Sequence, residues 1–153
     1  MKKLILLTLL IMVSVTSFTQ KVNLKKEVVS IDDTPVFLLK YDFGMNIITI
    51  YNLDNKKLMI LPVETYYDSQ KITSGNPEGR VVYYDASFLT ADIEKCEFNV
   101  PGGRKQLAKY LIEYNLIKEG ELDEQAVQQF VKIHGKKFSE ERGRSTTIII
   151  KSR

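Results

Sequence analysis

The chain has 153 residues, of which 44% are hydrophobic and 27% are charged, and its formal net charge is +3. This composition is typical of a globular domain, and it excludes a disordered chain and a protein that crosses a membrane many times. A single Cys and a single His exclude an internal disulfide and any site that needs two imidazoles.

Residues 1–20 have the features of a secretory signal peptide. Two lysines follow Met1, an apolar run extends from Leu4 to Val15, and small polar residues end the segment. A membrane-spanning helix needs about 20 apolar residues, and this run is shorter. We therefore expect cleavage after Ser17 or Thr19 and a periplasmic or secreted protein, with no transmembrane helix after cleavage.

Residues 21–153 are expected to form one α+β domain. A lipoprotein needs a Cys directly after the cleavage site, and the Cys of this chain is Cys96, so we expect no lipid anchor. Removing the leader takes away two lysines and lowers the formal charge from +3 to +1. Nucleic-acid-binding domains are usually far more basic, so we expect no nucleic-acid partner.

The first part of this domain predicts about six antiparallel strands. Asp32-Asp33-Thr34-Pro35 and Asp54-Asn55-Lys56 are turn signals between apolar, β-branched segments. Pro62 cannot donate to a ladder, so it predicts an edge strand, a bulge or a break. The predicted strands are 27–31, 36–41, 46–53, 57–67, 80–88 and 91–98, with the longest loop at 69–79.

Two helices are expected next, over 104–118 and 124–134, because apolar residues recur at helical spacing. Gly120 is the expected stop of the first helix and Asp123 the N-cap of the second, and the short connection predicts a tight helical hairpin. Residues 136–145 are expected to form a polar, basic loop. The last segment, 146–151, contains three isoleucines and is expected to return to the sheet as a strand. The predicted fold is thus an antiparallel meander, a two-helix hairpin and a C-terminal strand.

Histidine-dependent, cysteine-dependent and metal chemistry are not expected. Cys96 and His134 lie far apart in the sequence, and no short metal-binding spacing occurs, so we expect no metal and no cofactor. His134 follows an apolar helical stripe and is interpreted as a packing or C-cap residue. Cys96 is interpreted as a buried thiol, with pairing to another chain as the alternative. A hydrolase could use two carboxylates, and its candidates are Glu64, Asp68, Asp85, Asp92, Glu94 and Glu97.

The tyrosines are the most informative feature. The chain has eight and no Trp, and four of them form the adjacent pairs Tyr66-Tyr67 and Tyr83-Tyr84. Neighbours on a strand point to opposite faces, so each pair should place one ring inward and one outward. One register would set Tyr67 opposite Tyr83 and Tyr66 opposite Tyr84. These rings either pack the sheet or form an exposed patch that binds a protein, peptide or glycan.

Two basic segments are candidates for contact with anions. Gly102, Gly103, Arg104 and Lys105 precede a predicted helix, where free backbone amides could hold a carboxylate or phosphate. The alternative is a simple turn that starts the helix. The C-terminal basic segment could likewise meet an acidic surface, or be a solvated loop; its residues are Lys136, Lys137, Arg142, Arg144, Lys151 and Arg153.

Three stretches give the chain a family resemblance: a leader that ends SFTQK, the strand-turn-strand segment EVVSIDDTPVF, and the helical segment QLAKYLIEYNLIKEGELDEQAVQQFVKIHGKKFS. They cover about half of the mature chain, which resembles small secreted proteins of uncharacterised function common in Bacteroidota. The resemblance implies an envelope or secreted setting and supplies no active-site residues.

The sequence therefore favours an exported, non-catalytic envelope domain that binds a protein, peptide or glycan through a Tyr-rich sheet face. Two alternatives stay open: a small periplasmic hydrolase that uses carboxylates and tyrosines, and an accessory subunit of an envelope complex.

Overall fold

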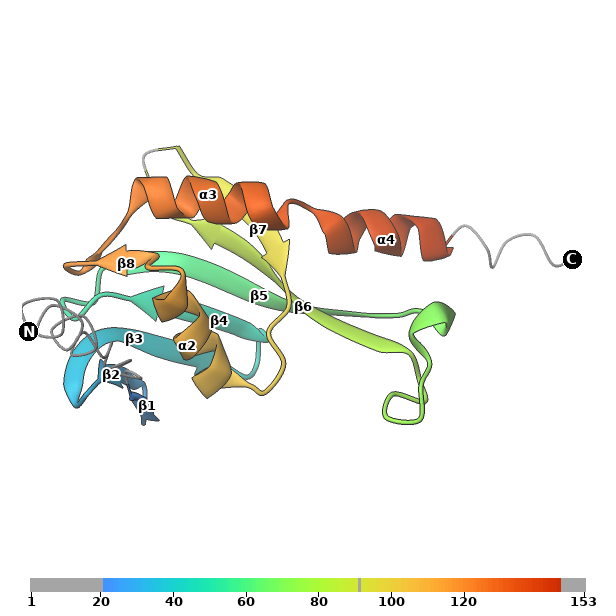
Figure 1. Ribbon diagram of the computed structural model, residues 1–153, viewed down its shortest axis with the longest axis horizontal. Helices are drawn as coiled ribbons and strands as arrows, with labels where there is room; N and C mark the ends of the chain where they lie inside the picture. Colours follow the sequence, from blue (N-terminus) through green and yellow to red (C-terminus); the bar gives the residue numbers. More distant parts are fainter. Residues whose placement is uncertain (1–20, 91, 147–153) are drawn as a thin grey trace, which may run out of the picture.

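The structure is a computed structural model that describes residues 21–90 and 92–146. It is an α+β fold, as predicted, built on one seven-stranded antiparallel sheet whose strands follow in chain order (Figure 1). The strands are β1 (Val22–Lys25), β2 (Val28–Ile31), β3 (Thr34–Asp42), β4 (Ile47–Tyr51), β5 (Lys57–Tyr67), β6 (Arg80–Phe88) and β7 (Glu94–Phe98). The first of them was not predicted.

The two faces of the sheet have different surroundings. Leu39, Ile50, Met59 and Phe88 face one another across β3 to β6 and are fully buried. We call their side the front face; it is covered by α2 (Arg104–Glu113) and α3 (Glu124–His134). The opposite side, to which the alternate residues of each strand point, is the back face.

The predicted hairpins are confirmed, and their turns show why the sequence specifies them. Asp32 and Asp33 take positive φ values of 48° and 64° between β2 and β3, and Asn55 takes 62° between β4 and β5. Asp and Asn adopt this left-handed conformation more readily than other non-glycine residues.

Pro62 lies in an inner strand, so the edge position is wrong, and the predicted alternative of a local break in the ladder is confirmed. It is opposite Ile47 of β4, while pairing between β5 and β6 is interrupted at Leu61 and Pro62 and resumes at Val63. The missing N–H therefore removes part of the ladder without ending β5.

The predicted second helix matches α3 from end to end. The Asp123 carboxylate accepts a hydrogen bond from the Ala126 backbone N at 2.9 Å, and Gly135 ends the helix with a φ of 57°. These are ordinary N-cap and C-cap interactions.

The first helix is shorter than predicted, and the two helices do not form a tight hairpin. α2 ends at Glu113, after which Asn115 takes a positive φ of 52°. The connection forms a small hairpin of β8 (Ile117–Lys118) and β9 (Glu121–Leu122), and Gly120 lies in its turn. Figure 1 shows α2 steeply inclined to α3.

The segment predicted as a basic loop is a helix, α4 (Lys137–Thr146). The Glu97 backbone N of outer strand β7 donates to the Gly135 carbonyl at 2.8 Å. The chain crosses from the front face to the back face at this point, because Phe130 of α3 contacts front-face rings, whereas Phe138 of α4 stacks on back-face Tyr83. Residues 147–151 of the predicted final strand lie outside the described residues.

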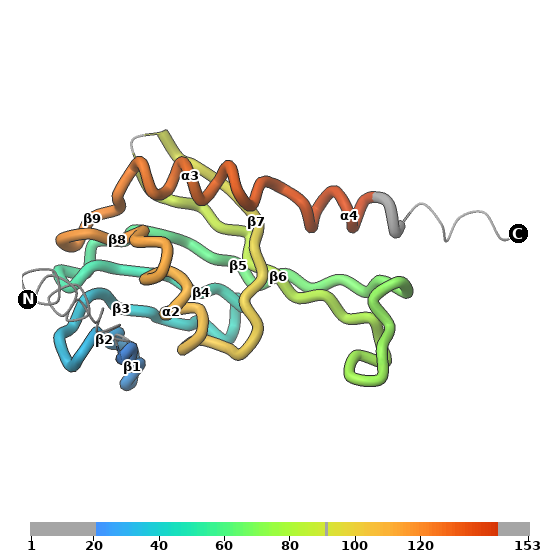
Figure 2. Tube along the Cα trace, viewed as in Figure 1, coloured from blue at the N-terminus to red at the C-terminus, as the bar shows by residue number. Residues whose placement is uncertain are grey.

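β5 and β6 extend beyond the rest of the sheet as an arm, residues 64–83 (Figure 2). Its tip contains a short 3₁₀ helix, η1 (Ser69–Lys71), capped by the Asp68 carboxylate, which accepts from the Gln70 backbone N. The Asn76 side chain donates to the carbonyls of Lys71 and Arg80 and accepts from the Arg80 backbone N. These bonds give the tip a defined shape.

None of the helices in the described ranges is long and apolar enough to cross a membrane.

Candidate functional site

The four tyrosines do not form the exposed patch that the sequence allowed. Tyr66, Tyr83 and Tyr84 are buried, and only Tyr67 is exposed, with 62% of its surface accessible. The predicted register is also wrong: Tyr66 lies opposite Val81, and Tyr83 lies opposite Glu64. Tyr66 and Tyr83 consequently share the back face as diagonal neighbours, with ring centroids 6.1 Å apart.

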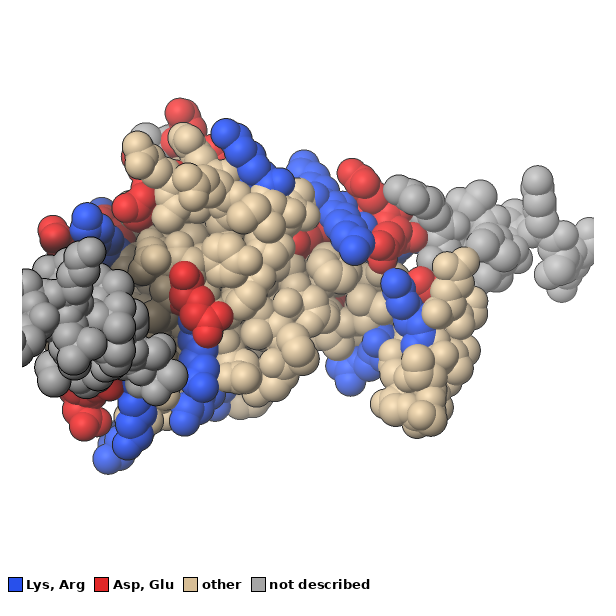
Figure 3. All heavy atoms as spheres, viewed as in Figure 1, with Lys and Arg blue, Asp and Glu red and all other residues tan. Residues whose placement is uncertain are grey.

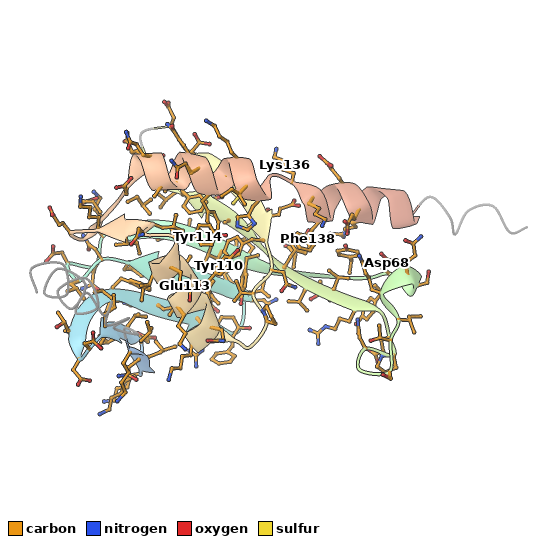
Figure 4. All side chains as sticks on the ribbon, viewed as in Figure 1. Asp68, Tyr110, Glu113, Tyr114, Lys136 and Phe138 are labelled. Atoms are coloured by element: carbon orange, nitrogen blue, oxygen red, sulfur yellow. The ribbon has the colours of Figure 1, made fainter. Side chains whose placement is uncertain are left out.

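Helix α4 covers this Tyr66–Tyr83 pair. The Phe138 ring stacks on Tyr83, with centroids 5.0 Å apart and planes 9° from parallel. The Tyr66 hydroxyl donates to the Glu141 carboxylate at 3.3 Å, and Figure 4 shows Phe138 between α4 and the arm. The Tyr66 and Tyr83 rings are therefore covered by a helix of the same chain.

Both hydroxyls are protonated at neutral pH, as tyrosines ordinarily are, and burial favours this form further. It raises the pKa of Tyr66 to about 12, and the Glu141 carboxylate acts in the same direction. It also raises the pKa of Tyr83, although a hydrogen bond with Arg142 partly offsets that effect. These hydroxyls are better suited to hold structure than to act as bases at neutral pH.

The predicted anion loop lies at the start of α2. Gly103 is the N-cap with a φ of 79° and no side-chain cap, and Gly102 precedes it with a φ of 100°. Arg104 and Lys105 are exposed beside them. The four residues are thus together, and anion binding there stays a prediction.

His134 and Cys96 lie in or beside an aromatic cluster between α2, α3 and the sheet. His134 Nε2 is 3.1 Å from the Tyr110 hydroxyl, and Figure 4 shows Tyr110 and Tyr114 on α2. Burial lowers the pKa of His134 and raises the pKa of the Cys96 thiol to about 12. Both residues pack the interior here; the rings that surround the imidazole are Phe98, Tyr110, Tyr114 and Phe130.

Several of the candidate carboxylates have structural contacts. The Glu97 carboxylate accepts from the Ser139 backbone N at 2.8 Å, and Asp68 caps η1. Glu64 and Asp85 share the back face with Glu97, and Asp92 and Glu94 line a small hollow beside α3. Within residues 21–90 and 92–146, no three His, Cys, Asp or Glu side chains lie close enough to hold a metal ion.

A concave surface lies on the back face over β3, β4 and β5, which α4 leaves uncovered. It is a shallow hollow of about 580 Å³. The half-buried side chains of Ile47, Thr49 and Ile60 form its floor. Its other lining residues are Lys40, Tyr41, Asp42, Met45, Tyr51 and Lys57.

The turn between β3 and β4 exposes two large apolar side chains: Met45 lines one end of this hollow, and Phe43 packs on the ring of Tyr41, another lining residue, with centroids 4.4 Å apart. Phe43 is 79% exposed and Met45 is 70% exposed. The Asp42 carboxylate accepts from the backbone N of Gly44 at 2.9 Å and of Met45 at 3.1 Å. Asn46 accepts from the Tyr41 hydroxyl and donates to the Val63 carbonyl, both at 2.6 Å. The turn is therefore a fixed structure.

Two lysines lie toward the other end of the hollow. Lys40 Nζ is 4.8 Å from the centroid of the Tyr51 ring and 3.4 Å from the Asn55 side-chain oxygen, and Lys57 is paired with Tyr51 in the ladder. The hollow thus combines an aliphatic floor, an apolar rim at the turn and two amines. Sequence reasoning missed this site, although Phe43 and Met45 in an otherwise polar turn were a usable signal.

On the front side, Figure 3 shows acidic and basic residues scattered around a broad uncharged area, with no large patch of one sign.

Comparisons with protein-family models, with curated proteins and with solved structures find no match.

Proposed function

We propose that this chain is an exported, non-catalytic binding module that takes a segment of another protein on the open back face of β3–β5. The observation that carries the proposal is the ordered turn that exposes Phe43 and Met45, because Met45 lines the hollow and Phe43 packs on Tyr41, which also lines it. Export rests on the leader-like sequence of residues 1–20.

The energetics favour burial of this rim by a partner. Burying a Phe or Met side chain contributes about 1.5–3 kcal/mol relative to leaving it in water. Asp42 and Asn46 already hold the turn in place, so binding loses little further conformational entropy there. A few large, well-placed side chains usually supply most of the affinity of an interface.

The chemistry of the hollow favours a peptide segment over a glycan. Sugar rings usually stack on an open aromatic face, whereas the floor of this hollow is Ile47, Thr49 and Ile60, and the Tyr51 ring beside it has the Lys40 ammonium over it. Ile47 and Ile60 suit aliphatic side chains instead, and Lys40 and Lys57 suit a carboxylate. The segment we propose therefore carries an aliphatic residue beside an acidic one.

Site-specific photocrosslinking tests the proposal in the cells that make the protein. A photoreactive phenylalanine replaces Phe43, and in a control it replaces Ile133, which is 63% exposed on α3. We expect one discrete adduct from position 43 and none from position 133. The adduct should be lost when Thr49→Arg fills the hollow, and the partner, identified by mass spectrometry and purified, should bind the wild-type chain and not the Thr49→Arg chain.

Two results would contradict the proposal: equal adducts from both positions, or an adduct that persists at full yield in the folded Thr49→Arg protein.

A further inference from the structure

We infer that the Tyr66–Tyr83 pair is a second binding site, that α4 is its resident and displaceable ligand, and that a helix of a partner protein with the same chemistry replaces α4. That chemistry is an aromatic residue followed four residues later by an arginine. The inference does not depend on what binds the hollow over β3–β5.

The contacts of α4 come from one side of the helix. Phe138 stacks on Tyr83, Glu141 accepts from Tyr66, and Arg142 hydrogen-bonds with Tyr83. Positions 138, 141 and 142 have the spacing of a single helical face. In addition, the backbone N of Ser139 in the first turn donates to the Glu97 carboxylate. The contacts that hold α4 thus come from one face of the helix, with one ring stacking and several polar interactions, and from its first turn.

The helix depends on these contacts for its own stability. Its sequence, KFSEERGRST, has one large apolar residue and contains Gly143 within the helix. A helix of ten residues with such a composition is marginal in water by itself. Release from the tyrosines should therefore also unwind α4, and docking and helix formation should occur together.

α3 does not need α4. It has its own N-cap at Asp123, and the Gly135 backbone N closes its last turn by donating to the Val131 carbonyl at 2.9 Å. Gly135 lies between the two helices with a φ of 57°, a conformation that costs glycine little. The α3–α4 junction can therefore act as a hinge while the front-face core stays intact.

The surface beneath α4 defines the ligand. Tyr66 is 6% exposed and Tyr83 is 3% exposed, so release of α4 uncovers two aromatic rings. Glu64, Asp85 and Glu97 share the back face around Tyr83 and would surround these rings with negative charge. An aromatic floor with an acidic rim matches a ligand that has one ring and one cation, as Phe138 and Arg142 do.

The test uses a fluorescent, acetylated peptide of residues 136–146 and the purified full chain. Phe138→Ala in the protein removes the stacking ring and should free the site. Since apparent affinity scales with the fraction of free sites, we expect this variant to bind the peptide at least about tenfold more tightly than the wild type. A peptide that itself carries Phe138→Ala should not bind, and Ile133→Ala in the protein should behave as the wild type.

Several results would overturn the inference. One such result is that the peptide binds neither the wild type nor the Phe138→Ala protein. Another is that it binds both equally well, because α4 would then not occupy the site to which the peptide binds. A wild-type dimer in light scattering that Phe138→Ala abolishes would assign the site to α4 of a second copy. Hydrogen exchange of the wild type is an independent check, because α4 amides that exchange only on global unfolding would show that α4 does not open by itself.

Discussion

The hydroxyl of Tyr110 and Nε2 of His134 lie 3.1 Å apart, and this contact joins α2 to α3 inside a cluster of aromatic rings. Burial lowers the pKa of His134, so burial favours the neutral imidazole in the folded protein, where it hydrogen-bonds with the Tyr110 hydroxyl. The stability of this packed cluster should therefore depend on the protonation of His134, the single histidine of the chain.

We expect stability to fall as the pH drops below about 6.5, the usual pKa of histidine in an unfolded chain. The unfolded chain then binds a proton more readily than the folded one, so protonation favours unfolding until the pH is below the folded pKa. Above about pH 7.5 the imidazole is neutral in both states and this effect is absent. Urea unfolding midpoints measured from pH 8 to pH 5 give the slope of stability against pH.

His134→Gln is the control for this pH dependence, because its amide can still hydrogen-bond with the Tyr110 hydroxyl but does not titrate. We expect the slope between pH 7.5 and pH 5.5 to be smaller in this variant. An unchanged slope would mean that other groups cause the pH dependence.

The arm tip should depend on Gly79. A Cβ at this position would lie 2.1 Å from the Asp68 carbonyl oxygen, and the φ of 64° is unfavourable for any residue with a side chain. We expect Gly79→Ala to lower the stability by about 2 kcal/mol or more. Gly75→Ala is the matched control in the same loop, because a Cβ there has no neighbour within 4 Å. Urea unfolding and hydrogen exchange of residues 68–80 should separate the two variants; equal stability would refute the assigned contact.

The aromatic cluster should make Phe130 one of the most important residues of the core. Its ring contacts Phe88, Phe98 and Tyr114 with centroids 4.8–5.8 Å apart. Truncation of a buried Phe costs about 3–5 kcal/mol, so Phe130→Ala should lower the melting temperature steeply. Ile133→Ala, on the exposed side of the same helix, should change stability by less than about 0.5 kcal/mol. Similar melting temperatures for the two variants would contradict this assignment of the core.

Cys96 should be unreactive in the folded protein. It is 1% exposed, and burial raises its pKa to about 12, so little thiolate forms at pH 8. We expect a thiol reagent such as DTNB to react with it only on unfolding in urea. Ser69→Cys, combined with Cys96→Ala, provides an exposed thiol that should react at once. Rapid labelling of native Cys96 would show that the cluster opens.

Local signals in the sequence predicted much of the fold. The Asp-rich turn at Asp32-Asp33 fixed a hairpin, and Asp123 with Gly135 gave both ends of α3. In these cases the residue itself favours the backbone conformation, so no knowledge of distant contacts is needed.

Elements that depend on tertiary contacts were predicted poorly. α4 has almost no apolar stripe, and its contacts come from Tyr83, Tyr66 and Glu97, which are distant in sequence. Residues 114–118, the last five of the predicted first helix, are not helical. Ile117 and Lys118 instead form β8, which pairs with β9 across a turn where Glu119 and Gly120 have positive φ.

The candidate site was missed for a similar reason. The register of the arm follows from the bonds of its tip, where the Asp68 backbone N donates to the Gly79 carbonyl. This arrangement places Tyr66 beside Tyr83 and not beside Tyr84. The hollow over β3–β5 is left open because α4 lies over β7 and the β5–β6 arm, which no local pattern in the sequence shows.

The hydrogen bond from the Glu97 backbone N to the Gly135 carbonyl also affects whether a strand of another chain could pair with this edge of the sheet. An outer strand normally offers free backbone groups to any chain that can align with it. At β7 the α3–α4 junction occupies that position, so strand addition by another molecule is obstructed at this edge. The opposite edge is β1, which is only four residues long and has Lys21, Lys25 and Lys26 beside it. A short edge strand flanked by lysines also discourages pairing with another chain, so both edges of the seven-stranded sheet are protected against fibril-like assembly.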